Sequence, residues 1–107
     1  MAVTMRASTA SRLHIDNYRA KMLDEYVTMV RDLDEATEWS QIITAALEAG
    51  LEKADLAREF AVAPTTIFRW QKGSAIPSPF LRRAIKSRLI ERLEEEARER
   101  SQMAVSA

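Results

Sequence analysis

The stretch DLAREFAVAPTTIFRWQKGSAIP, residues 55–77, predicts two short helices joined by a tight turn. Leu56 and Phe60 lie four residues apart, so they share one face of the first helix. Pro64 suits the first position of the second helix, because its missing N–H would have no intrahelical partner there. Gly73 is expected to end that helix, since glycine readily adopts the left-handed conformation found after helix C-termini.

The positions of the apolar and turn-forming residues resemble those of the phage-repressor (Xre-type, lambda-repressor-like) helix-turn-helix family. The positions that carry the resemblance are Leu56, Ala57, Val62, Ile67, Trp70, Gly73 and Pro77. The resemblance covers residues 39–89, about half of the chain. The chain departs from the family at Ala63, which is usually Ser or Thr, at Gln71, which is often Glu, and at Phe68, which is often small and polar.

In this family the second helix of the motif lies in the DNA major groove, so the resemblance implies a recognition helix over residues 64–72. The residues expected to contact bases are Pro64, Thr65, Thr66, Phe68 and Arg69. Arginine can bond guanine O6 and N7 together, and threonine can bond a base or contact a thymine methyl. The residues expected to contact phosphates, which position a protein without reading sequence, are Lys53, Lys72, Ser74, Arg82 and Arg83.

Several of these residues also fit a structural role. Arg69 could be solvent-exposed or could pair with Glu59, and Phe68 could meet thymine methyls or be partly covered by the N-terminal helix. For the basic residues after the motif, the alternative to phosphate contact is an ordinary solvated helix face. Those residues are Arg82, Arg83, Lys86 and Arg88.

Charge is distributed unevenly along the chain, although 16 basic and 16 acidic residues sum to zero. Residues 51–90 hold eight basic and three acidic residues, a local charge of +5. Residues 1–50 carry −3 and residues 91–107 carry −2. Because a polyanion responds to charge within about one Debye length, the basic motif is the expected nucleic-acid surface.

Composition favours one small all-α domain, since the 107 residues include only two glycines and three prolines. The chain has no cysteine and one histidine, so we expect no disulfide, no metal site and no cofactor. We expect no enzymatic activity, because no glycine-rich phosphate loop and no nucleophile–histidine pair is present. The longest uncharged apolar stretch is too short to cross a bilayer, which predicts no membrane contact and a cytoplasmic protein, located at the nucleoid through DNA binding.

Residues 14–36 are expected to form an amphipathic helix, because apolar residues recur at three- and four-residue steps. These residues are Ile15, Tyr18, Met22, Tyr26, Met29, Val30 and Leu33. This stripe could pack on the core of its own chain or pair with its copy in a second subunit. Residues 1–13 lack acidic residues and predict a disordered tail, with a transit peptide or a DNA-contacting arm as alternatives.

The DNA-binding domain is expected to span residues 37–100, followed by a flexible tail over 101–107. Its last helix is expected from Pro79 to about Arg98, with a stripe that closes the core; the stripe is Phe80, Leu81, Ala84, Ile85 and Leu89. A second set, Ile90, Leu93 and Ala97, could form a seam with a partner or a solvated helix end. The fold class is all-α: a five-helix lambda-repressor-like helix-turn-helix domain with an added N-terminal amphipathic helix and an extended C-terminal helix.

The expected function is that of a sequence-specific transcriptional regulator of prokaryotic or phage type, acting as a repressor on double-stranded DNA. Because one such domain reads few base pairs, a homodimer on a two-fold operator is expected. The N-terminal and C-terminal helices are the candidates for the dimer contact. The alternative is a protein-binding adaptor, an antitoxin or an antiactivator, whose protein partner contacts the acidic N-terminal helix.

Overall fold

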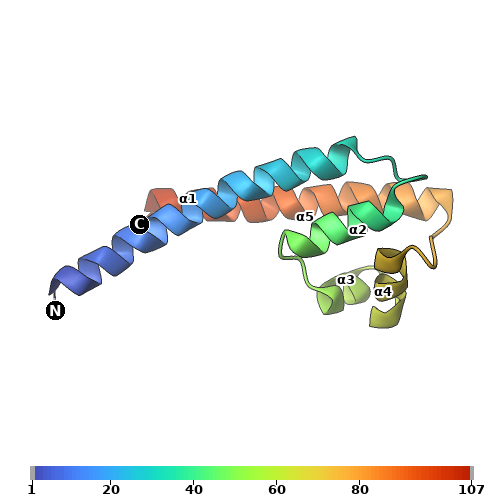
Figure 1. The fold of residues 1–107 in the computed structure, drawn as a ribbon, viewed down its shortest axis with the longest axis horizontal. Coiled ribbons are helices and arrows are strands. Elements are labelled where there is room, and N and C mark those ends of the chain that lie inside the picture. The colour runs from blue at the N-terminus through green and yellow to red at the C-terminus, as the bar shows by residue number, and fades with distance from the viewer. Residues whose placement is uncertain (1, 107) are drawn as a thin grey trace.

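Residues 2–106 form five helices (Figure 1). The computed structural model describes the backbone of residues 2–106 and the side chains of residue 15 and of residues 17–103. The helices are α1 (Ala2–Asp32), α2 (Trp39–Glu48), α3 (Lys53–Glu59), α4 (Pro64–Lys72) and α5 (Pro79–Ser106). Residues 2–106 contain no strand, so the prediction of an all-α protein is confirmed.

The first helix is longer than the periodicity predicts. We expect a disordered tail over residues 1–13 and a helix within residues 14–36, whereas α1 begins at Ala2. Residues 2–13 contain neither glycine nor proline, and Ala, Met, Arg and Leu favour helix, so nothing in this stretch interrupts α1. With α1 counted among the five helices, the region that follows it has four helices, where the prediction has five.

The last helix is also longer than predicted. We expect it to end at about Arg98, whereas α5 continues to Ser106. It runs antiparallel to α1 and beside it along the long axis of a molecule that measures 55 × 25 × 19 Å (Figure 1). The residues that the two helices bury are Ala20, Leu23, Val27 and Val30 of α1, and Ile85, Leu89, Leu93 and Ala97 of α5. The helix α1 therefore packs on its own chain, and the predicted partner seam of α5 is part of the same core.

The buried faces of these two helices differ from the predicted ones. Tyr18 is 66% exposed and Ile15 and Met29 are about half exposed, although all three belong to the predicted apolar stripe of α1. Phe80 is 80% exposed and Leu81 is about half exposed, although both are predicted to close the core. The physical reason in α1 is that apolar residues occupy two adjacent faces, of which α5 covers only one.

Two tryptophans join α4 to the rest of the core. The rings of Trp39 in α2 and Trp70 in α4 meet edge to face, with centroids 5.7 Å apart and planes inclined by 73°. This is a favourable arrangement for aromatic quadrupoles. Leu56 of α3 and Ile67 of α4 are fully buried, as the motif predicts. The apolar residues of 55–77 therefore hold α4 on α2, and α3 packs against α4.

Backbone conformation fixes both ends of α4. Gly73 ends the helix with φ +78°, and the N–H of Ser74 donates to the carbonyl of Arg69 at 3.0 Å. The predicted stop at Gly73 is therefore confirmed. In the turn before α4, Ala61 adopts φ +54°. A residue with a Cβ pays about 1–2 kcal/mol for this left-handed conformation.

We expect Ala61→Gly to stabilise the fold by about 0.5–1 kcal/mol, because relief of the left-handed strain exceeds the greater freedom of glycine in the unfolded chain. Urea denaturation monitored by tryptophan fluorescence measures the change. Ala54→Gly, at an exposed position inside α3, is the matched control and should destabilise by about 0.5–1 kcal/mol. Equal destabilisation in both variants would show that Ala61 is not strained.

Candidate nucleic-acid interface

The outward face of α4 is set by the residues that it buries. Ile67 and Trp70 point into the core, so the other side chains of the helix lie toward solvent. Of the five predicted base-contacting residues, Pro64, Thr65, Phe68 and Arg69 are exposed and Thr66 is half-buried. All five lie on α4, and Thr66 is the least accessible of them.

Phe68 contacts two lysines that come from different helices. The Nζ atoms of Lys53, the first residue of α3, and of Lys72, the last residue of α4, each lie 4.8 Å from the centroid of the phenyl ring. An ammonium group at this distance is attracted by the ring quadrupole. Phe68 remains 44% exposed, and the two lysines over its ring come from α3 and α4. Two of the predicted phosphate-contacting lysines therefore meet around one residue of α4.

Three cations of α3 and α4 lack the carboxylate partners that Arg58 of α3 and most cations of α5 have. Among the described residues, no carboxylate forms an ion pair with Lys53, Arg69 or Lys72. Glu59, the alternative partner of Arg69, pairs with two arginines of α5 instead. The positive charge of α4 and of the start of α3 is thus uncompensated by nearby acid.

Arg82 does not reach outward as a phosphate contact would require. Its guanidinium donates to a carboxylate oxygen of Glu35 at 2.8 Å and to the carbonyl of Pro77 at 2.7 Å, and its side chain is only 12% exposed. Arg82 thus ties the α1–α2 loop to the start of α5, which leaves it poorly placed for the predicted phosphate contact. Arg83 lies 3.5 Å from the same carboxylate, but its side chain is 73% exposed.

Lys86 and Arg88 also form hydrogen bonds within the protein. The ammonium group of Lys86 donates to the carbonyls of Arg31 and Leu33 at the end of α1. A cation at a helix C-terminus satisfies free carbonyls and complements the helix dipole. Ser74, a predicted phosphate contact, is exposed, and its hydroxyl donates to the carbonyl of Arg69 at 3.4 Å. Ser74 therefore stays accessible next to α4.

Glu59 holds two arginines of α5 against the end of α3. The guanidinium of Arg92 donates to one oxygen at 2.7 Å, and that of Arg88 donates to the other. Burial alone would raise the pKa of the Glu59 carboxyl, but these hydrogen bonds and positive charges hold the pKa below its ordinary value of 4.5. Hydrogen bonds to Glu59 and Glu91 raise the pKa of Arg88.

We expect Glu59→Gln to lower the free energy of unfolding at pH 7 by about 1 kcal/mol. Because the folded pKa of Glu59 is depressed, its contribution is complete above the unfolded pKa and is lost as pH falls through the folded pKa. Denaturation experiments from pH 7 to about pH 3 should therefore show that the free energies of unfolding of the two proteins converge below pH 4.5, the ordinary pKa of the carboxyl. Glu48→Gln, at an exposed position of α2, should show no such convergence. A difference that persists unchanged at low pH would contradict this role of Glu59.

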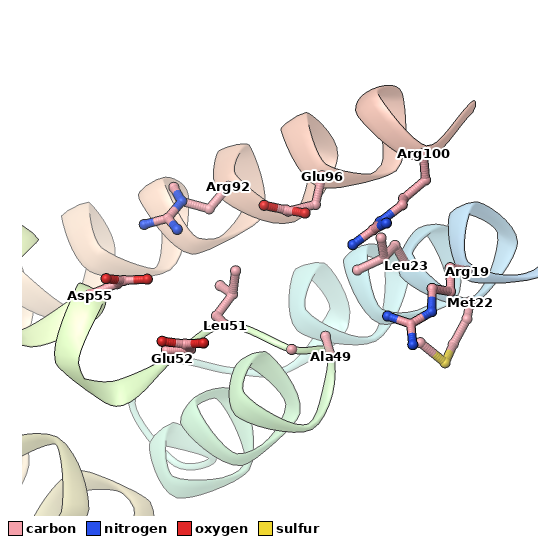
Figure 2. A pocket seen from close by; sticks show the side chains of 11 residues that line it. Arg19, Met22, Leu23, Ala49, Leu51, Glu52, Asp55, Arg92, Glu96 and Arg100 are labelled. Carbon is pink, nitrogen blue, oxygen red and sulfur yellow. The ribbon is translucent and has the colours of Figure 1, made fainter. Parts of the chain in front are cut away.

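A polar cleft of about 280 Å³ lies between α1, the α2–α3 turn and α5 (Figure 2). Its charged lining residues are Arg19, Arg92, Arg100, Glu52, Asp55 and Glu96. Three cations and three carboxylates balance one another, and Arg92 is already bonded to Glu59. In the described part of the chain, no group of three or more His, Asp or Glu residues could hold a metal ion. The cleft is therefore a weaker candidate site than the face of α4.

Comparison of the chain with models of known protein families, with curated proteins and with solved structures found no match in any of the three. The resemblance to the helix-turn-helix family stays a prediction from the sequence, carried by residues of 55–77. Across residues 2–106, no helix combines the length and the apolar character needed to cross a membrane.

Proposed function

We propose that the protein is a sequence-specific DNA-binding regulator that uses α4 as its recognition helix. One observation carries the proposal: three cations on or beside α4 have no carboxylate partner among the described residues, whereas most cations of α5 are paired. These three cations are Lys53, Arg69 and Lys72. Lysines and arginines that neutralise phosphates supply most of the affinity for DNA. Uncompensated charge around an exposed helix favours such a polyanion over a protein surface of mixed charge.

Arg69 is the residue most suited to reading a base. It lies on the exposed face of α4, and the described residues offer it no competing carboxylate. An arginine that bonds guanine O6 and N7 discriminates by about 1–3 kcal/mol. Thr65, in the first turn of α4, would approach the neighbouring bases. Occupation of a promoter by such a protein would repress transcription.

We expect Arg69→Ala to reduce discrimination between duplexes by about 1–3 kcal/mol, because the bidentate contact to guanine is lost. Fluorescence anisotropy can compare DNA from upstream of the protein's own gene with a scrambled duplex at several salt concentrations. Arg82→Ala is the matched control: it should lower thermal stability, since it breaks the contact with Glu35, and leave discrimination unchanged. Loss of discrimination in Arg82→Ala but not in Arg69→Ala would contradict the assignment.

The homodimer contact is proposed to involve the start of α5. The seam of α5 that was a candidate for the contact is buried within the chain, whereas Phe80, at the start of the same helix, is 80% exposed. Its neighbour Leu81 lines an apolar cavity of about 370 Å³, together with residues such as Val62 and Trp70. A two-fold contact in which each Phe80 enters the other copy's cavity would be self-complementary. Because Trp70 belongs to α4, the contact would also fix the two recognition helices relative to each other.

We expect Phe80→Ser to shift the protein from dimer to monomer in sedimentation velocity experiments, since the exposed aromatic anchor is lost. Tyr18→Ser, which removes an aromatic residue that is 66% exposed on α1, should leave the dimer intact. The reverse outcome, a monomer in Tyr18→Ser and a dimer in Phe80→Ser, would place the contact on α1.

A protein-binding adaptor is the second candidate, and one observation favours it. Ile15, Tyr18 and Met29 form an exposed apolar row on α1 that no described part of the chain covers fully. A protein partner seated on this row would remain bound in Arg69→Ala and would be lost in Tyr18→Ser. Co-purification with these two variants distinguishes the adaptor from the DNA-binding regulator.

A further inference from the structure

Phe68 is the residue of α4 whose chemistry departs most from the resemblance, and its surroundings suggest a different task from reading bases. Each ammonium group lies 4.8 Å from the ring centroid, so the Nζ atoms of Lys53 and Lys72 are at most twice 4.8 Å, or 9.6 Å, apart. This separation is about one Debye length at physiological ionic strength. The two charges therefore act on a nearby anion as one site.

The ring of Phe68 offsets the repulsion between these two ammonium groups. Two like charges at such a separation repel, and no described carboxylate forms an ion pair with either lysine. The negative quadrupole of the ring attracts both ammonium groups, each by about 0.5–1 kcal/mol at an exposed site. A leucine or a small polar residue at this position would leave the two lysines free to move apart.

The acidic residue next to Lys53 does not quench the pair. Glu52 lines the polar cleft between α1 and α5 together with Asp55 (Figure 2). Lys53 lies instead over the ring of Phe68. The lysines thus contact a residue of α4 while Glu52 and Asp55 line the cleft, and neither lysine forms an ion pair with a described carboxylate.

We propose that Phe68 is a positioning residue that holds Lys53 and Lys72 together as one phosphate-binding pair on the DNA backbone. The inference rests on the proposed function, since it assigns a task within the same face. It also moves Phe68 from the predicted base-contacting residues to the residues that organise backbone contact. The ammonium groups of the two lysines already contact the ring, which leaves the ring poorly placed to contact thymine methyls.

The consequence is measurable as a salt dependence. The slope of log Kobs against log salt concentration changes by about 0.9 for each phosphate that a protein neutralises. Phe68→Leu should therefore reduce the magnitude of the slope by roughly one to two, and weaken binding to the specific and the scrambled duplex alike by roughly tenfold. Phe68→Trp, which keeps an aromatic face, should retain the wild-type slope.

Two controls separate positioning from a general structural effect. Lys21→Gln removes an exposed lysine of α1 and should leave the slope unchanged. In a protein that carries both Lys53→Gln and Lys72→Gln, the further change Phe68→Leu should have no additional effect on the slope. Because Phe68 is 44% exposed, we expect Phe68→Leu to fold, and its unfolding temperature is measured alongside.

An unchanged slope in Phe68→Leu with altered discrimination between the two duplexes would overturn the inference and assign Phe68 to base contact. An additional loss of slope when Phe68→Leu is combined with the two lysine changes would overturn it as well. If the wild-type protein binds neither duplex in a salt-dependent way, the proposed function itself fails. That outcome is distinct, since it appears before any substitution is compared.

Discussion

The edge-to-face contact between Trp39 and Trp70 determines which side of α4 is available for function. Trp70 and the fully buried Ile67 lie on the same side of a nine-residue helix, and together they press it onto α2. Once that side is buried, Phe68 and Arg69 must face solvent. A helix this short has little stability of its own. Its position, and therefore the proposed interface, depends on this packing.

The charge pattern builds on that arrangement. Most basic residues of α5 are held by acidic residues of other elements, with Glu35 binding Arg82 and Glu59 binding Arg88 and Arg92. These pairs contribute modestly to stability, but they remove positive charge from α5. The cations of α3 and α4 that lack a carboxylate partner among the described residues are Lys53, Arg69 and Lys72. A protein with zero net charge thereby presents a local cationic surface.

The sequence predicts well what depends on local signals and poorly what depends on distant partners. Pro64 and Gly73 define α4 because a proline at the first position and a left-handed stop act within one turn. Glu35 lies 47 residues from Arg82, and no local pattern indicates their pairing. The contact of Phe68 with Lys72 was predictable from their four-residue spacing, whereas the contact with Lys53 depends on how α3 packs. The exposure of Ile15, Tyr18 and Met29 was not predicted, because α1 has two adjacent apolar faces and α5 covers only one of them.

DNA binding by the α3–α4 face is tested most directly by amide chemical-shift mapping of the full chain with a duplex from upstream of its own gene. The largest perturbations should fall on the start of α3 near Lys53, on α4 and on Ser74, with little change in α1. Perturbations confined to the exposed row of α1, or none at all with either a specific or a scrambled duplex, would contradict the claim that the α3–α4 face binds DNA.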